Sequence, residues 1–302
     1  MLYTANESFL SYKINDGIIN DYYQNIVELI KKIFLNNPKL NVNINLCDNF
    51  NFNNNNVTLN IKINYEHTLV KNGGRDIPAG TPYGGILYNN NEKYFVRIDN
   101  YHNLQNSDII IDYSIPNIHN VRSSPIYNLF SKKHIYISSS IYEPYFFKEK
   151  RNIVTLTTFI NVNEPRRKML LDKINDEKIE HTNVNNCFNK DMLQNILKNT
   201  KILINIHQTP HHDTFEELRV LPALECGVIV ISEKSPLTEM IPYKDLIIWE
   251  NYDDIINKVK EVINNYDFYY NKLFTTENIN TLYNLPKINY DILQNAIMQK
   301  MA

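Results

Sequence analysis

Three histidines and an aspartate gather within residues 207–213, and two glutamates follow at Glu216 and Glu217. His207 and His211 are spaced H-x3-H, which is compatible with a metal site, but the Thr-Pro dipeptide between them predicts a loop rather than a helix. No D-x-D sequence, the usual carboxylate clamp for a metal-bound nucleoside diphosphate, occurs in the chain. We therefore predict no metal site and expect His207, neutral or protonated, to hydrogen-bond a phosphate or a sugar.

The segments on either side of this loop predict where it lies. Residues 201–206 and 228–232 are short apolar runs of the kind that form buried parallel strands. Between them, Thr214 and Glu217 have the T-x-x-E spacing of a capping box, and Gly227 stands where a helix ends in a left-handed residue. The loop thus joins the carboxyl end of a strand to a helix N-terminus, where backbone N–H groups favour a phosphate.

A basic cluster follows another predicted strand. Arg166, Arg167 and Lys168 fall in the first turn of a helix predicted over 165–175. Cations at a helix N-terminus oppose its dipole, so an anionic partner would stabilise them. They either point into solvent or bind a phosphorylated ligand. Because both strand ends belong to one predicted sheet, we expect this helix and the His207 loop to converge on one diphosphate.

The acidic residues of the helix after the His207 loop are spaced E-x7-E. Glu217 and Glu225 lie just over two turns apart, on faces that differ by about 80°, so they need not share a ligand. Glu217 serves either as a capping residue or as an acceptor of hydrogen bonds from vicinal sugar hydroxyls. Glu225 lies near the other helix end, where a negative charge opposes the dipole.

Length and composition limit the class of protein. The chain has 302 residues, of which 43% are hydrophobic, enough for two domains, which we place at 1–145 and 146–302. A net charge of −2 argues against a nucleic-acid partner. No apolar run approaches the roughly 20 residues of a transmembrane helix. Three cysteines without C-x-x-C spacing suggest neither disulfides nor zinc, so we expect a soluble, cytoplasmic protein.

Periodicity predicts an α/β fold. Beyond residue 153, strands and helices alternate as in a doubly wound sheet. The predicted strands are 153–158, 179–184, 201–206, 228–232 and 245–248, and the helices 165–175, 189–199, 214–226 and 252–265. The first half contains helices over 16–35 and, interrupted, 116–130, with strands over 40–46, 57–64, 67–70, 94–98, 108–112 and 133–137. Strands 40–46 and 57–64 alternate apolar with polar residues, which predicts one buried and one wet face. The tail 269–302 is partly helical and could pack back across the first domain.

A glycine-rich segment interrupts the first half. Residues 71–85 hold five of the seven glycines of the chain. The segment is either a long hairpin loop or a mobile loop that presents Gly73, Gly74, Arg75 and Asp76 to a cleft between the domains, on the acceptor side.

The segment LINIHQTPHHDTFEELRVLPALECGVIVISE resembles the donor-binding segment of GT-B glycosyltransferases, particularly the group-1 and spore-maturation-protein-like families. The resemblance covers residues 153–265, within the C-terminal half. Residues 218–220, 226–227 and 232–233 match the family pattern, but Pro222 stands where the family has the glutamate that holds the nucleotide ribose.

This resemblance implies two Rossmann-like domains with a cleft between them. It also implies transfer of a sugar from a nucleotide-sugar donor, here a UDP-sugar, to a glycan, protein or other hydroxyl acceptor, in the manner of a hexosyltransferase. Such families use neither metal nor another cofactor. We expect catalytic roles for Glu217 and His207, and donor contacts from Arg166, Arg167, His211, Thr214, Phe215, Glu216 and Arg219.

Two points stay open at this stage. If the reaction inverts the anomeric centre, a base from the first domain is needed, and His67, Asp76 and Asp99 are candidates. The alternative function is that of a noncatalytic nucleotide-sugar or glycan-binding protein with the same fold, which Pro222 favours.

Overall fold

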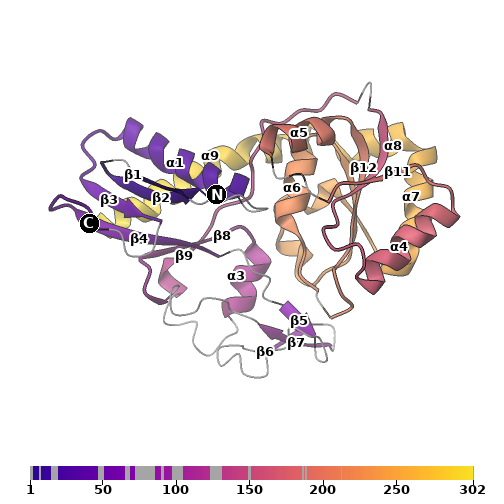
Figure 1. The fold of residues 1–302 in the computed structure, drawn as a ribbon, viewed down its shortest axis with the longest axis horizontal. Coiled ribbons are helices and arrows are strands. Elements are labelled where there is room, and N and C mark those ends of the chain that lie inside the picture. The colour runs from indigo at the N-terminus through magenta and orange to yellow at the C-terminus, as the bar shows by residue number, and fades with distance from the viewer. Residues whose placement is uncertain are drawn as a thin grey trace.

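A computed structural model was used, and Figure 1 shows its fold. It describes residues 3–6, 8–14, 20–46, 51–64, 69–71, 86–89, 92–96, 105–122, 131–148, 151–185, 187, 189–211 and 213–301.

The N-terminal half is built on a six-stranded sheet with the strand order β1-β2-β3-β4-β8-β9. Strand β1 pairs antiparallel with β2, and every other neighbouring pair is parallel. A separate three-stranded antiparallel sheet has the order β5-β7-β6. The strand bounds are Tyr3–Asn6 (β1), Leu10–Ile14 (β2), Val42–Asn45 (β3), Val57–Asn64 (β4), Leu69–Lys71 (β5), Ile86–Asn89 (β6), Glu92–Val96 (β7), Ile109–Asp112 (β8) and His134–Tyr136 (β9).

The C-terminal half is built on a five-stranded, wholly parallel sheet with the order β11-β10-β12-β13-β14. Its strands are Ile153–Thr157 (β10), His181–Asn183 (β11), Thr200–Asn205 (β12), Ile229–Glu233 (β13) and Ile247–Glu250 (β14). The two parallel sheets, each packed with helices, confirm the prediction of an α/β protein with two Rossmann-like domains. Strand β14 begins two residues later than predicted, after a short 3-10 turn over Lys244–Leu246.

Helices cover both faces of the C-terminal sheet. In Figure 1, α5 and α6 lie on the side of the N-terminal sheet, while α4, α7 and α8 lie on the far side. Within the part of the chain that the structure describes, no helix has both the length and the apolar character needed to cross a membrane. The helix bounds are Asn20–Asn36 (α1), Ile115–Arg122 (α3), Pro165–Asp176 (α4), Lys190–Lys198 (α5), Glu217–Glu225 (α6), Ile255–Asn264 (α7), Tyr266–Leu273 (α8) and Thr276–Met301 (α9).

Strand β3 corrects the prediction that it has one wet face. All four of its residues are buried, including Asn43 and Asn45. The Asn43 amide donates to Asn54 Oδ1 at 2.7 Å, and the Asn45 amide donates to Asn60 Oδ1 at 2.9 Å. Asparagine is tolerated inside this sheet because neighbouring asparagines satisfy its polar groups.

Helix α9 links the two halves of the molecule and runs beside α1 (Figure 1). Leu282 and Leu285, near its start, belong to the C-terminal core, whereas Leu293 and Ile297 belong to the N-terminal core. Between these groups the buried Asn289 accepts from the backbone N–H of Ser138 at 2.9 Å and donates to its carbonyl at 3.0 Å. The two chain segments that pass between the halves are thereby hydrogen-bonded to each other.

Candidate functional site

The strand order of the C-terminal sheet creates a ligand-binding position. Strand β10 continues through α4 to β11 on one side, while β12 and the strands after it lie on the other side of β10. The connections therefore leave the neighbouring strands β10 and β12 in opposite directions, which makes their carboxyl ends the topological switch point of the sheet. In open α/β sheets, ligands bind at this switch point. The loops that begin there include residues 158–164 and 206–211.

The structure brings these two loops into contact, while their convergence on one diphosphate stays a prediction. An Nη1 hydrogen of Arg166, in the first turn of α4, points at the carbonyl oxygen of His207 across 3.4 Å. The amide of Gln208 donates to Glu164 Oε1, also at 3.4 Å. The basic start of α4 and the histidine loop therefore form one surface.

Within the basic cluster, Arg166 has an anionic partner that is a side chain of the protein itself. Arg166 forms a bidentate ion pair with Glu233, the last residue of β13, and one of its two hydrogen bonds measures 2.6 Å. The guanidinium also stacks on the ring of Tyr252, 3.9 Å from its centroid. Arg167 is buried, with its guanidinium 5.0 Å from the centroid of the Phe159 ring, while Lys168 is exposed. Arg166 is thus held rigidly at the site.

His207 is buried behind this ion pair. Its Nε2 lies 2.8 Å from the hydroxyl of Ser235, and its backbone N–H donates to Glu233 Oε2 at 3.0 Å. Its Nδ1 faces two carboxylates, Asp213 Oδ1 at 3.6 Å and Glu233 Oε2 at 3.5 Å. Burial lowers the pKa of His207, and Arg166 acts in the same direction, whereas Glu233 and Asp213 raise it.

The start of α6 differs from the predicted capping box. The helix begins at Glu217, its N-cap is Glu216, and no side chain caps it. Thr214 and Phe215 are buried ahead of the helix, with the Phe215 ring 4.8 Å from that of Trp249. The capping prediction failed because the buried Phe215 extends the loop over Trp249 and carries the helix start past Thr214.

The remaining predicted donor residues lie around this loop. His211 is half-buried, and its backbone N–H donates to the Thr209 hydroxyl at 3.2 Å. Arg219 points back under the loop, where its Nη1 donates to Asn205 Oδ1 at 2.8 Å.

Glu217 lies at the boundary between the two halves rather than at a capped helix end. Its carboxyl group is fully buried and accepts from the Tyr243 hydroxyl at 2.5 Å, while its carbonyl accepts from the Ser139 hydroxyl at 3.1 Å. Burial raises the pKa of Glu217 to about 8, partly opposed by hydrogen bonds from Ser114 and Tyr243, while Asp112 raises it further. Burial therefore favours the neutral form of the Glu217 carboxyl group over the ionised form, compared with an exposed glutamate.

Glu225 is also fully buried and binds the segment that connects the two halves. One carboxylate oxygen accepts from the Ser140 hydroxyl, and the other accepts from the backbone N–H groups of Ile141 at 3.0 Å and Tyr142 at 2.8 Å. Burial raises the pKa of Glu225 to about 7 against these hydrogen bonds. Glu217 and Glu225, the two glutamates of the E-x7-E spacing, are thus both buried but have different hydrogen-bond partners.

Helix α6 ends at Glu225 with Cys226 as its C-cap, and Gly227 follows as the left-handed residue that the sequence predicted. Gly227 has a φ of +67°, and a Cβ there would lie 2.8 Å from the Tyr145 carbonyl oxygen and 2.8 Å from Arg151 Nη2. Glycine is needed for the left-handed conformation and for this close approach of the connecting segment.

Sequence reasoning missed Ser235 and Tyr252, and it matched Glu233 to the family pattern without giving it a role in the site. These three residues complete the surroundings of Arg166 and His207, and they lie at or just beyond the carboxyl ends of β13 and β14. The available signal was the position of Glu233 and Ser235 directly after an apolar strand, the same signal that identified the His207 loop.

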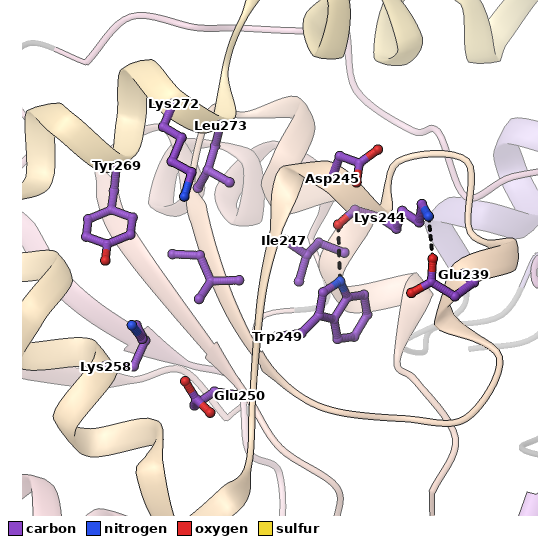
Figure 2. A pocket seen from close by; sticks show the side chains of 11 residues that line it. Glu239, Lys244, Asp245, Ile247, Trp249, Glu250, Lys258, Tyr269, Lys272 and Leu273 are labelled. Atoms are coloured by element: carbon purple, nitrogen blue, oxygen red, sulfur yellow. Dashed lines mark hydrogen bonds and ion pairs between the residues drawn. The ribbon is translucent and has the colours of Figure 1, made fainter. Parts of the chain in front are cut away.

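A hollow of about 410 Å³ lies along β14, the last strand of the sheet. Figure 2 shows that side chains of β14 and of the flanking helical segments line it, among them Lys244, Trp249, Lys258 and Tyr269. Lys244 is paired with Glu239, and Lys258 with Glu261. None of Arg166, His207 or Glu233 lines this hollow, so it is separate from the switch point.

Several predicted residues lie outside the described part of the chain. They are Gly73, Gly74, Arg75 and Asp76 of the glycine-rich segment, together with the base candidates His67 and Asp99.

Comparison with known proteins finds a sequence relative and several structural neighbours, two of which are described here. No family model matches the chain. The chain is 29% identical over 202 residues to Uncharacterized protein R358 of Acanthamoeba polyphaga mimivirus, a match that covers 63% of this chain and 68% of that protein. The crystal structure of TarM superposes with a TM-score of 0.50 at 10% identity, covering 89% of this chain. The crystal structure of a glycosyltransferase from Rickettsia africae ESF-5 gives a TM-score of 0.43 at 11% identity, over 93% of this chain and 81% of that one.

The likeness to TarM is a likeness of fold. The match spans 58% of the TarM chain, less than two thirds of its length. It supports the two-domain α/β architecture described above.

Proposed function

We propose that this protein is a glycosyltransferase that moves a sugar from a nucleoside diphosphate donor, a UDP-sugar, to a hydroxyl group of a glycan or protein, without a metal ion. The observation that carries the proposal is the meeting of the loops after β10 and β12 at the switch point, where Arg166 stands against the carbonyl of His207. The resemblance of the same segment to GT-B donor-binding sequences supports it independently.

In the proposed reaction, the site must stabilise the negative charge of the departing nucleoside diphosphate. A positive charge and helix N-termini that are already in place act on developing negative charge at no cost of reorganisation. Glu233 and Tyr252 hold the Arg166 guanidinium in place on two sides, although the Glu233 carboxylate also offsets its charge. The donor would need to compete with Glu233 for the outer hydrogens of Arg166 or approach the edge that Glu233 leaves uncovered.

We propose that residues 146–302 bind the donor and that residues 1–145 bind the acceptor. In this arrangement, His207 acts at the diphosphate, and Glu217 acts at the boundary between the halves. Because the Glu217 carboxyl is buried under Tyr243, contact between Glu217 and a donor sugar would require Tyr243 to move aside. The roles of His211, Thr214, Phe215, Glu216 and Arg219 follow as contacts of the donor along the loop and the first turns of α6.

The proposal is tested by incubating the protein with a panel of nucleotide sugars in EDTA and measuring the nucleoside diphosphate that is released. We expect slow donor hydrolysis with one donor, stimulated by acceptor and unchanged by EDTA. Binding of a donor without release would instead favour the noncatalytic binding protein, consistent with the buried Pro222 inside α6. Loss of release in EDTA that manganese restores would contradict the metal-free mechanism.

Arg166→Ala is expected to weaken binding of uridine diphosphate by about 1.5–3 kcal/mol, since a charge-assisted hydrogen bond is lost and Glu233 is left unpaired. Arg166→Lys should recover part of this loss because it keeps the charge without the bidentate geometry. Lys173→Ala is the control: Lys173 also lies over the Tyr252 ring, at 5.7 Å, but in the last turn of α4. Calorimetry would contradict the assignment if Arg166→Ala and Lys173→Ala bound the diphosphate equally.

A further inference from the structure

Ser235 places a hydroxyl group at the edge of the candidate site, and within the described part of the chain its hydrogen-bond partner is His207. Ser235 lies two residues after the end of β13 and is half-buried, whereas the His207 side chain is buried. The distance between Ser235 Oγ and His207 Nε2 is 2.8 Å, a full hydrogen bond whose direction depends on the charge of the imidazole.

The other ring nitrogen determines what Nε2 can do. His207 Nδ1 faces Asp213 Oδ1 at 3.6 Å and Glu233 Oε2 at 3.5 Å. These distances are too long for full hydrogen bonds, but two ionised carboxylates that face Nδ1 favour a hydrogen on that nitrogen electrostatically, in the neutral as well as in the charged ring. The proton gained or lost by His207 is therefore the one on Nε2, the nitrogen that faces Ser235.

Two states of the Ser235 hydroxyl follow from this geometry. When His207 is neutral, Nε2 is an acceptor, and the Ser235 O–H points inward to it. When His207 is protonated, Nε2–H donates to Ser235 Oγ, and the hydroxyl hydrogen turns outward to the site. We infer that Ser235 is a hydrogen-bond donor to the diphosphate of the ligand and that protonation of His207 turns this donor on. The inference rests on the proposed function, because it assigns an anionic ligand to the same site.

The groups around His207 set the balance between the two states. Glu233 at the end of β13, Asp213 in the histidine loop and Glu216 at the start of α6 favour the protonated ring, whereas burial and Arg166 at the start of α4 oppose it. Burial is the largest of these effects and lowers the pKa of His207. The outward state is thus populated below the ordinary histidine pKa of about 6.5, and a bound diphosphate favours it further.

The test is the affinity for uridine diphosphate, measured by calorimetry from pH 8 to pH 5 on the wild type, Ser235→Ala and Ser235→Thr. The ratio of the Ser235→Ala dissociation constant to the wild-type constant cancels the protonation of the ligand itself. We expect this ratio to be close to one at pH 8 and to rise to about tenfold at pH 5, which corresponds to about 1.4 kcal/mol. Ser235→Thr keeps a hydroxyl group and should follow the wild type at every pH, which also shows that a substitution at this half-buried position folds.

Distinct results separate the ways in which the inference could fail. A ratio that does not change with pH would overturn it while leaving the donor site in place. If the wild type bound uridine diphosphate and Ser235→Thr behaved like Ser235→Ala, the hydroxyl would not be the donor, and the inference would be overturned as well. If the wild type bound no nucleoside diphosphate at any pH, both the proposed function and the inference about Ser235 would fail.

Discussion

Glu225→Ala is expected to lower the free energy of unfolding by about 3–5 kcal/mol, because three hydrogen-bond donors in the interior lose their acceptor. The donors are the Ser140 hydroxyl and the backbone N–H groups of Ile141 and Tyr142. All three belong to the segment that connects the two sheets, so the loss should also loosen the attachment of that segment to α6. Urea denaturation followed by circular dichroism measures the effect.

Two further variants make this expectation specific. Glu225→Gln keeps one carbonyl oxygen for the two backbone N–H groups and offers its amide to Ser140, so it should cost only about 1 kcal/mol. Glu177→Ala removes a carboxylate from an exposed ion pair with Lys260 at 2.7 Å, and such pairs contribute roughly 0–1 kcal/mol. If Glu225→Ala were as mild as Glu177→Ala, the buried contacts of Glu225 would not be important for stability.

Glu217→Gln is expected to become more stable relative to the wild type as the pH rises from about 5 to about 9, by roughly 2 kcal/mol or more. Burial raises the pKa of Glu217 to about 8, above its ordinary value of 4.5, so the folded state keeps a proton that the unfolded chain has lost. Stability that depends on this proton is fully present below pH 4.5 and is lost as the pH rises through about 8. Glutamine cannot ionise and escapes this loss.

The measurement is the difference in unfolding free energy between the wild type and Glu217→Gln at several pH values, which cancels the titration of groups common to both. Glu277→Gln removes the same charge from an exposed position in the first turn of α9 and should show no such trend. Glu225→Gln should show a similar trend at lower pH, since the pKa of Glu225 is raised to about 7. A difference between Glu217→Gln and the wild type that is independent of pH would mean that Glu217 ionises in the folded protein as it does in water.

Prediction from the sequence was most accurate for elements that are specified by their own residues. The apolar runs at β12 and β13 and the glycine at position 227 specify strands and a helix end whatever surrounds them. The short strands β1 and β2 were not predicted, because each is stabilised by pairing within the N-terminal sheet rather than by a long apolar run. The prediction that the face of β3 carrying Asn43 and Asn45 is wet was wrong because the hydrogen-bond partners of these side chains lie on other segments, which local sequence does not show.

Sequence alone determined that a loop with three histidines follows one strand of a doubly wound sheet and that a basic helix start follows another, since strand and helix periodicities are local properties. Only the tertiary structure decided what these side chains touch. Arg166 is paired with Glu233, which lies 67 residues further along the chain, and Glu225 binds residues that precede it by 83 to 85 positions. The partner of a buried charge depends on which segments pack around it. Burying a charge without a partner costs free energy, so the charged group pairs with the polar groups that the fold places next to it.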